Sequence, residues 1–367
     1  MTTIIYDYFS PAYKAGGPTQ SLNNLVANLN TTPLKIVTTN LDLDGAVLAV
    51  KPDEWINFKE TASKVWYAST ASRPLIKEMI DSEAVLFINS IYSHHFDYIA
   101  LLRSKAKRKI ISPRGMLDQG SLSQKSWKKK AYLAYWKLLG LHKACEWHAT
   151  TELEKENIQR TFGNNQTIWV VPNFPKIISY HKVPKQVDEL KLITVALISP
   201  MKNHLLVLEA LQKCTGRITY DIYGPIKEQD YWYRCLEAIK NLPDNIAVNY
   251  HGDLIPSDLD QALQAAHVFI QPSKSENFGH SLFEAMTAGK PIITSHNTPW
   301  NQLTENRAGI NVSIDSTTDI EQAIQFFTRM DSDDWQLWNE SCRNYALLKI
   351  DIPAIKNGYL QMFENRS

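Results

Sequence analysis

The stretch HVFIQPSKSENFGHSLFEAMTAGKPIITS, residues 267–295, decides the fold class of this 367-residue chain. Its apolar run HVFIQPS predicts a buried strand, and the apolar spacing in HSLFEAMTA predicts a helix, with Gly289 just past its end. KPIITS predicts the next strand. Because a strand, a helix and a second strand follow one another, this stretch predicts one repeat of a parallel α/β sheet.

The same alternation continues on both sides of this stretch. Further strands are predicted at TIIYDYF, LKIVTT, AVLFI, RKIIS, TIWVVPN, LKLITVALI, ITYDIYG and IAVNYHG. Between the two series lies FPKIISYHKVPKQVDEL, which has two prolines and no clear period and therefore predicts a linker. The sequence predicts an α/β fold with two doubly wound, Rossmann-like domains facing each other across a cleft, where such folds bind ligands.

The predicted domain limits follow from this pattern. A first domain is expected over residues 1–176, a linker over 177–190 and a second domain over 191–350. Residues 351–367 are expected to form a C-terminal helix that packs back on the first domain. Residues 1–176 carry a net charge of +7 and residues 177–367 one of −6, which suggests that the two domains meet different partners.

Composition indicates a globular protein of the cytoplasm. Hydrophobic residues make up 44% and charged residues 21% of the chain, and no apolar run is long enough to span a membrane. The N-terminal residues do not resemble a signal peptide. The four cysteines lack metal-ligand spacing, so we expect buried free thiols in a reducing compartment.

The loop KSENFG, residues 274–279, predicts a ligand site at a helix start. Unpaired N–H groups at a helix N-terminus attract anions, and Gly279 lets a phosphate approach the backbone closely. Glu284 would accept hydrogen bonds from a vicinal diol such as ribose, and Glu276 would meet sugar hydroxyls beyond the phosphates. The alternative is that Glu276 only favours the helix dipole and that Glu284 is a solvated surface residue.

A second helix start with glycines occurs near the N-terminus, in KAGGPTQSL. Gly16 and Gly17 predict a tight turn after a strand, and Pro18 is suited to the first helical position. Facing the other helix start across a cleft, these residues would bind the same phosphates. An ordinary turn is the alternative.

Together, these motifs resemble the retaining, nucleotide-sugar-dependent glycosyltransferases of the GT-B fold, in the large group called family 4. The resemblance rests on SENFGHSLFEAMTAGKPIITS, AGGPTQSL and ISPMKN (198–203), and it covers nearly the whole chain. It is closest to a bacterial subgroup that builds cell-surface polysaccharide, through ISPRGML (111–117), WHATTELEKENI (147–158), DIYGPI (221–226), ENFGH (276–280) and NTPW (297–300).

The resemblance implies a role for individual residues. Glu276, Lys202 and Arg114 would be catalytic, with Lys202 pairing with the pyrophosphate as a point charge. The family usually has an arginine five residues before that lysine, but this chain has Leu197 there. Arg114 would supply the missing charge from the other domain, or else form a structural salt bridge. The implied donor site comprises Gly16, Gly17, Lys202, Asn203, Glu276, Asn277, Phe278, Gly279, His280, Ser281 and Glu284.

The implied activity is transfer of a hexose-type sugar, with retention, from a nucleotide diphosphate to a saccharide acceptor that is lipid-linked. UDP is the favoured nucleotide, and the nucleotide sugar is a co-substrate, so no cofactor is expected. The Asp-Leu-Asp sequences at 42–44 and 258–260 match the letters of a metal-binding motif but lie in unsuitable places, so we expect no metal. Two alternatives remain open: a GT-B-fold nucleotide-sugar epimerase, and a non-catalytic nucleotide-sugar-binding protein, which Leu197 favours.

A basic, aromatic segment lies in the first half. From Gln119 to Cys145 the chain has no acidic residue but six lysines, with Trp127, Tyr132, Tyr135 and Trp136 among them. Such a segment suits the surface of an anionic membrane, so residues 125–143 predict peripheral binding to the inner face of the cytoplasmic membrane. The alternative is a domain helix with a solvated lysine face. We expect no nucleic-acid partner.

Overall fold

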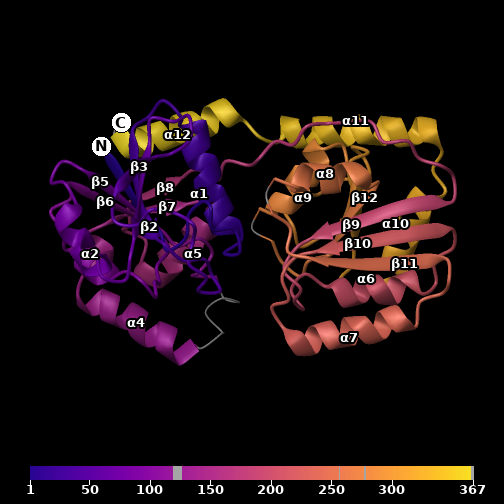
Figure 1. Cartoon of the computed structure of the whole chain (residues 1–367), viewed down its shortest axis with the longest axis horizontal. Coiled ribbons are helices and arrows are strands. Elements are labelled where there is room, and N and C mark those ends of the chain that lie inside the picture. Colours follow the sequence, from indigo (N-terminus) through magenta and orange to yellow (C-terminus); the bar gives the residue numbers. More distant parts are fainter. Residues whose placement is uncertain (119–125, 256, 277, 365–367) are drawn as a thin grey trace. The chain divides into compact units, whose positions relative to one another are not determined.

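The computed structural model describes residues 1–118, 126–255, 257–276 and 278–364, which form two units (Figure 1). The first unit contains Met1–Phe174 and the C-terminal stretch from Ile352, and the second contains Pro175–Asp351. Within the described residues, no helix has both the length and the apolar character needed to cross a bilayer.

The first unit is built on a mainly parallel sheet in the order β3-β4-β2-β1-β5-β6-β7-β8. Its strands are β1 (Thr2–Ile5), β2 (Leu34–Thr39), β3 (Trp55–Asn57), β4 (Lys64–Ala68), β5 (Val85–Asn89), β6 (Arg108–Ser112), β7 (Glu146–Ala149) and β8 (Ile168–Val170). Only β3, at the edge, pairs antiparallel with its neighbour among these strands. In β1 both faces are buried, as a parallel strand under two layers of helices requires.

The helices of the first unit lie between and after these strands. They are α1 (Gly17–Asn28), η1 (Arg73–Met79), α2 (Tyr98–Leu102), α4 (Ser126–Leu138), η2 (Leu141–Lys143), α5 (Glu152–Phe162) and α12 (Ile352–Glu364). Leu22, Leu25 and Val26 of α1 are fully buried, in agreement with their helical spacing in the sequence.

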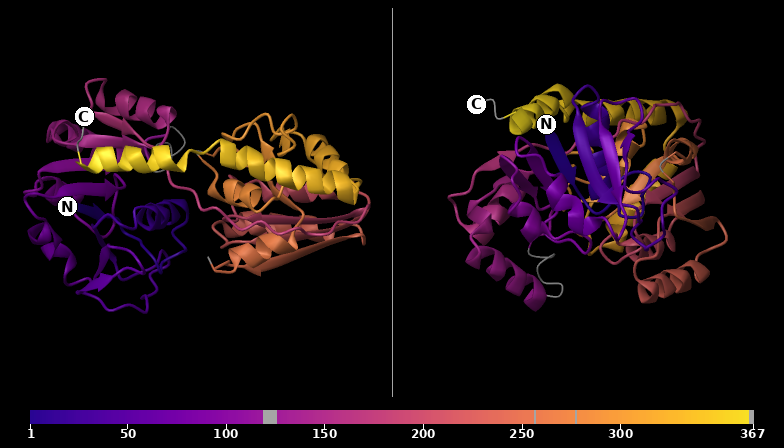
Figure 2. Two further views of the ribbon diagram at one scale, coloured as in Figure 1. Left: turned by 90° about the horizontal axis from the view of Figure 1, so that it is seen from above. Right: turned by 60° about the vertical axis from the view of Figure 1, so that its left-hand side comes forward.

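The C-terminal helix α12 packs against the sheet of the first unit (Figure 2). The Phe363 ring lies 5.4 Å from that of Phe87 in β5, and the Tyr359 ring stacks on Phe174 at 5.4 Å. Nη1 of Arg108 donates to the carbonyl of Met362 at 2.8 Å. Aromatic packing and this hydrogen bond therefore attach the end of the chain to its first unit.

The second unit has the parallel order β11-β10-β9-β12-β13-β14, which in chain order is third, second, first, fourth, fifth and sixth. This is the strand order of dinucleotide-binding folds. The strands are β9 (Glu189–Val195), β10 (Arg217–Tyr223), β11 (Ile246–Gly252), β12 (Val268–Gln271), β13 (Ile292–Ser295) and β14 (Gly309–Val312). The predicted fold class, with two doubly wound Rossmann-like domains, is confirmed.

Helices cover both faces of this second sheet (Figure 1). They are α6 (His204–Leu211), α7 (Gln229–Lys240), α8 (Leu259–Ala265), α9 (His280–Thr287), α10 (Thr317–Thr328) and α11 (Ser332–Leu348). Local sequence explains several of their ends. At the start of α11, for example, the Asp331 side chain accepts hydrogen bonds from the N–H groups of Asp333 and Asp334, as the acidic run there predicts.

Residues 177–190, predicted as a linker, lie in the second unit. They contain no helix, and a strand begins only at Glu189. Ile178 belongs to the core of that unit, and its N–H donates to Thr287 Oγ1 at 3.0 Å. Nζ of the buried Lys185 donates to the carbonyls of Gln186, Thr328 and Met330. The segment is thus packed on the unit that follows it.

Gly289 should be one of the least replaceable residues of the second unit. It follows α9 with φ +74°, and a Cβ there would lie 2.5 Å from the Tyr180 ring. Gly252 has the same φ but open space around it, so replacing it measures the cost of the left-handed backbone without the cost of a steric clash. We expect Gly252→Ala to lower the free energy of unfolding by about 1–2 kcal/mol, the cost of a left-handed alanine. Gly289→Ala should cost clearly more in urea denaturation, and equal losses would contradict the steric argument.

Candidate functional site

The candidate site of the second unit lies at the carboxyl ends of β9 and β12. These two strands are neighbours in the sheet. The strands that follow β9 in the chain, β10 and β11, lie on one side of it, and β12, β13 and β14 lie on the other side. Parallel α/β sheets bind ligands at such a switch point, because the loops on either side diverge there. Lys202 follows β9, and Glu276 follows β12.

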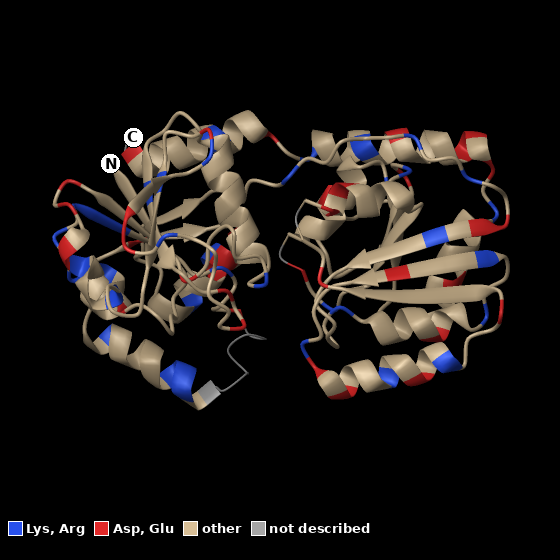
Figure 3. Ribbon diagram, in the orientation of Figure 1, with Lys and Arg blue, Asp and Glu red and all other residues tan. Residues whose placement is uncertain are grey.

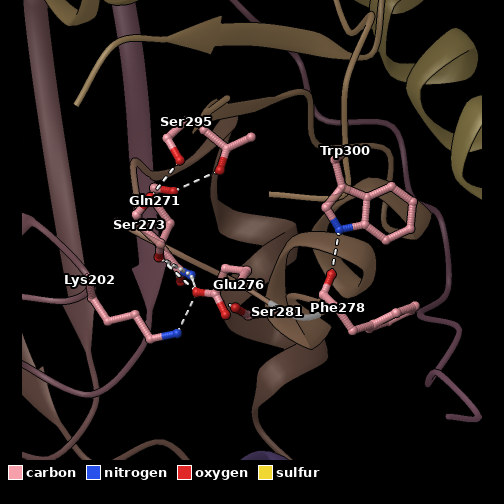
Figure 4. A network of polar contacts seen from close by, with 9 residues as sticks. Lys202, Gln271, Ser273, Glu276, Phe278, Ser281, Ser295 and Trp300 are labelled. Atoms are coloured by element: carbon pink, nitrogen blue, oxygen red, sulfur yellow. Dashed lines mark hydrogen bonds and ion pairs between the residues drawn. The ribbon is translucent and has the colours of Figure 1, made fainter. Parts of the chain in front are cut away.

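The carboxylate of Glu276 is held by three donors on one oxygen (Figure 4). Its Oε1 accepts hydrogen bonds from Lys202 Nζ at 2.5 Å, Ser273 Oγ at 2.7 Å and Gln271 Nε2 at 2.8 Å. Within the described part of the chain, Oε2 accepts no hydrogen bond. The ion pair is largely shielded, since the side chains of Lys202 and Glu276 are 22% and 12% exposed. One oxygen is therefore fixed and the other is available to a ligand.

A further layer of hydrogen bonds supports this arrangement. Ser295 Oγ donates to the Ser273 carbonyl at 2.5 Å, and the Lys274 N–H donates to the Met201 carbonyl at 2.9 Å. Ser281 Oγ donates to Oε1 of Gln271 at 3.2 Å. Gln271 and Ser273 are not among the residues predicted from the sequence. Their signal is the change from apolar to polar residues where β12 ends.

Gly279 forms the N-cap of α9 in the left-handed conformation, with φ 74° and ψ 65°. Gly279 has no side chain to cap the helix, so this helix start suits a ligand that accepts hydrogen bonds from backbone N–H groups. The preceding carbonyl, of Phe278, accepts a hydrogen bond from Trp300 Nε1 at 2.7 Å. His280 and Ser281 form the first helical turn beside it. Asn277, also predicted to contact the donor, lies outside the described residues.

Glu284 lies in α9 and is only 3% exposed. The alternative of a solvated surface residue is therefore wrong. A carboxylate is rarely buried in this way unless it serves a hydrogen-bonding or binding role. Glu276 and Glu284 lie before and within the same helix, one on each side of Gly279, as the sequence indicates.

The start of α6 adds polar groups that face the same switch point. Asn203 caps the helix with φ 62° but makes no side-chain capping bond, and its Nδ2 is buried without a partner among the described residues. The neighbouring His204 is 1% exposed. Burial and then the charge of Lys202 lower the pKa of His204 to about 4, so its ring is neutral. His204 is not among the residues predicted from the sequence.

Two predicted site elements, the Gly16–Gly17 turn and Arg114, lie in the first unit. Gly16 caps α1 with φ 74°, the space around it is open, and Pro18 falls at the second helical position, one later than predicted. The helix start thus exposes backbone N–H groups without a side-chain cap. That Gly16 and Gly17 bind the donor remains a prediction.

Arg114 follows β6 and is held by neutral amides. Its Nε and Nη2 donate to Oδ1 of Asn89, the former at 3.1 Å, and its Nη1 donates to Oδ1 of Asn173. Among the described residues it forms no ion pair, so the alternative of a structural salt bridge is wrong. Burial, and then the charge of Arg114, lower the pKa of the neighbouring His148 to about 3. Within residues 1–118, 126–255, 257–276 and 278–364, Arg114 is therefore a cation without a carboxylate partner.

The two Asp-Leu-Asp sequences serve the local structure. Both oxygens of Asp42 accept backbone N–H groups of Tyr13, Lys14 and Leu43, and Asp44 pairs with Lys14 Nζ at 2.7 Å. Asp260 accepts a hydrogen bond from Gln264 Nε2. The described residues contain no group of three His, Cys, Asp or Glu side chains placed to hold a metal ion.

Comparisons with known proteins agree with this architecture. Residues 178–342, all in the second unit, match the family model for Glycosyl transferases group 1. A comparison with curated proteins gives no match.

Solved structures resemble the chain over its length. HepE from Anabaena, solved with UDP and glucose, has a TM-score of 0.72 at 15% identity and covers 100% of both chains. Sucrose-phosphate synthase from Thermosynechococcus elongatus has a TM-score of 0.72 at 16% identity, covering 99% of this chain and 98% of that one. WaaG, a glycosyltransferase involved in lipopolysaccharide biosynthesis, has a TM-score of 0.66 at 13% identity and covers 99% of each chain. These similarities show the GT-B fold.

A double-mutant cycle should detect the ion pair of the site. We expect Lys202→Met and Glu276→Gln to couple by about 1–2 kcal/mol in the free energy of unfolding, because the pair is partly buried. The exposed pair of Lys240 and Glu237, at 2.6 Å in the same unit, is the matched control and should couple by about 0.3–0.5 kcal/mol. Equal coupling in both cycles would mean that the pair does not organise the loops.

Proposed function

We propose that this protein is a retaining glycosyltransferase that transfers a hexose-type sugar from a nucleotide diphosphate, UDP first, to a saccharide acceptor. The observation that carries the proposal is the uncapped start of α9 at Gly279, beside the Lys202–Glu276 pair. An uncapped helix start and a lysine together suit a diphosphate. The match of residues 178–342 to Glycosyl transferases group 1 and the fold shared with UDP-bound HepE support it.

We propose donor contacts at the two helix starts of the second unit. Glu284 accepts the ribose diol, and Oε2 of Glu276 accepts hydroxyls of the donor sugar. Oε1 keeps its bonds to Ser273 and Gln271, so Lys202 can turn towards the pyrophosphate without leaving the carboxylate unsatisfied. Asn203, His280 and Ser281 lie at the two helix starts beside it. Lys202 then meets the charge that develops on the departing diphosphate.

The proposed reaction needs no enzyme nucleophile. The bond between the sugar carbon and the β-phosphate oxygen breaks, and the acceptor oxygen bonds to that carbon on the same face. The acceptor proton passes to an oxygen of the leaving β-phosphate. Backbone N–H groups, Lys202 and, from the first unit, Arg114 supply the positive charge, and we propose that no metal ion is required.

We further propose that the acceptor is lipid-linked, that the product is cell-surface polysaccharide, and that α4 binds the cytoplasmic membrane. Leu133 and Trp136 of α4 are buried in the core, whereas Trp127, Tyr135 and Leu138 are 70%, 48% and 82% exposed. Lysines accompany this outer face, and the helix has no acidic residue (Figure 3). An exposed apolar stripe flanked by lysines suits an anionic bilayer surface.

A donor panel tests the proposed activity. The protein is incubated with UDP-, GDP-, ADP- and dTDP-hexoses, with and without a lipid extract that contains lipid-linked acceptors. Each incubation is carried out in excess EDTA and in Mg²⁺. We expect nucleotide release from one UDP-hexose that depends on the acceptor and persists in EDTA. Isomerised donor without acceptor would identify an epimerase, and donor binding without any turnover would identify a binding protein. Loss of turnover in EDTA, restored by Mg²⁺, would contradict metal independence.

The two glutamates should affect different steps. Glu284→Ala removes the ribose contact and should weaken binding of bare UDP by roughly 1.5–3 kcal/mol, about 10- to 100-fold. Glu276→Ala should leave UDP affinity nearly unchanged and lower turnover of the complete donor, because the sugar is its partner. Calorimetric titration with UDP decides between them. Equal loss of UDP affinity in the two variants would refute this division of roles.

Membrane binding should depend on the outer face of α4. Lys129 is only half-exposed, so the lysines to replace are the exposed Lys128, Lys130 and Lys137. Each should contribute about 1 kcal/mol of attraction to anionic lipid, so the triple glutamine variant should lose sedimentation with anionic vesicles.

The controls for membrane binding use the same first unit. The triple glutamine variant of the exposed Lys51, Lys64 and Lys77 should sediment like the wild type. Higher salt should release the wild type, because exposed charges are screened over about 8–10 Å. If the wild type does not sediment with anionic vesicles, the lysines of α4 are only solvated and the helix does not bind a membrane.

A further inference from the structure

The first unit contains a second polar cluster, at the carboxyl ends of β1, β4 and β5, that the donor chemistry does not use. Tyr8 follows β1, Arg73 begins η1 after β4, and His95 follows β5. The order β4-β2-β1-β5-β6 makes the boundary between β1 and β5 the switch point of this sheet. Ligands of parallel α/β sheets bind at this kind of position.

The loop that carries His95 is held in place by a buried carboxylate. Asp7, 6% exposed, accepts hydrogen bonds from Ser93 Oγ at 2.5 Å and from the His94 N–H at 3.4 Å. Ser93 Oγ in turn accepts the N–H groups of His95 and Phe96, at 3.0 and 2.9 Å. The carboxylate of Asp7 is therefore occupied with the loop, and the loop positions the His95 ring.

His95 forms a hydrogen bond with only one nitrogen of the Arg73 guanidinium. Nη1 of Arg73 lies 3.1 Å from Nδ1 of His95, and since a guanidinium only donates, Nδ1 accepts and the proton of the ring is on Nε2. Nε2 faces the hydroxyl of Tyr8 at 3.5 Å. Burial, opposed by Asp7 and assisted by Arg73, lowers the pKa of His95, which keeps the ring neutral. The positive charge of the cluster therefore belongs to Arg73.

The other edge of Arg73 is vacant. Its Nε and Nη2 are buried, and neither has a hydrogen-bond partner in the described part of the chain. No carboxylate of that part forms an ion pair with it. Arg108, in the same unit, shows what this edge does when occupied: its Nε and Nη2 donate to the two carboxylate oxygens of Glu146 at 2.7 and 2.6 Å. A buried guanidinium edge without an acceptor is destabilising, so the geometry favours an anionic ligand.

We propose that Nε and Nη2 of Arg73 bind an oxyanion of the acceptor, each nitrogen donating a hydrogen bond to one oxygen of that oxyanion. The inference rests on the proposed glycosyltransferase function and names the acceptor as an acidic saccharide. The oxyanion is either the carboxylate of a uronic acid or a phosphate linked to the sugar. Arg73, Tyr8 and His95 are each partly exposed, so a ligand reaches the cluster through a rotation of the Arg73 side chain. Tyr8 and the exposed His94 lie beside Arg73 and would form hydrogen bonds with hydroxyl groups of the sugar.

Three small probes test the site by NMR titration of the full chain. Methyl glucuronide presents a carboxylate, glucose 6-phosphate presents a phosphate, and methyl glucoside is the neutral reference. We expect at least one anionic probe to bind ten-fold or more tightly than the neutral one, and the stronger of the two identifies the source of the oxyanion. Equal binding of all three probes would overturn the proposal.

Variants assign the preference to Arg73. Arg73→Met should abolish it, and Arg73→Lys should retain only part of it, because lysine keeps the charge but loses the two-pronged geometry. Arg103→Met, at an exposed arginine of the same unit, is the matched control and should bind like the wild type. A preference that persists in Arg73→Met would place the anion elsewhere, for example in the second unit, and would refute the proposal.

UDP affinity measured on the same samples separates the two claims. Since Arg73 is not among the proposed donor contacts, Arg73→Met should bind UDP as the wild type does, and its NMR spectrum, compared with that of the wild type, shows that the variant is folded. Wild type that binds UDP but shows no anion preference would refute this inference and leave the proposed function intact. Wild type that prefers the anionic probes but does not bind UDP would refute the proposed function alone.

Discussion

The ion pair between Lys202 and Glu276 is the interaction on which the site of the second unit depends. It joins residues 74 positions apart because the strands before them, β9 and β12, are neighbours at the switch point of a parallel sheet. Ser273 and Gln271 donate to the same carboxylate oxygen, so Glu276 stays held when the lysine moves, and the bond from the Lys274 N–H to the Met201 carbonyl still joins the two loops. A ligand with phosphates can therefore recruit the cation without leaving a buried carboxylate unsatisfied.

Two arginines of the first unit, Arg114 and Arg73, are held by neutral partners instead of a carboxylate. Arg114 is held by the amides of Asn89 and Asn173, and Arg73 by the neutral ring of His95, so in the described residues neither has a counter-ion. This agrees with the excess of basic residues in the first half of the chain. Each unit therefore has cations that can bind an anionic ligand. In the second unit, Lys202 must first leave its ion pair with Glu276, whereas Arg114 and Arg73 of the first unit form no ion pair with a described residue.

Residues 267–295 show how much of the fold and site the sequence predicts. The strand, the helix, Gly279 before it and Gly289 after it are all local features, and periodicity and turn chemistry predict each of them. The partners of Glu276 are not local. Lys202 was predicted to face phosphate, and its pairing with Glu276 depends on which strands become neighbours. The same holds for Arg73 and His95, and the burial of Glu284 arises from packing between α9 and the sheet.

The central claim is that a nucleotide diphosphate binds at the uncapped start of α9 beside Lys202. Hydrogen–deuterium exchange with and without UDP tests it most directly, because the first N–H groups of a helix exchange quickly unless a ligand accepts them. We expect slower exchange at residues 279–283 and 203–206 when UDP is added, and unchanged exchange in α10 and α11 of the same unit. Unchanged exchange at both helix starts under saturating UDP would contradict it.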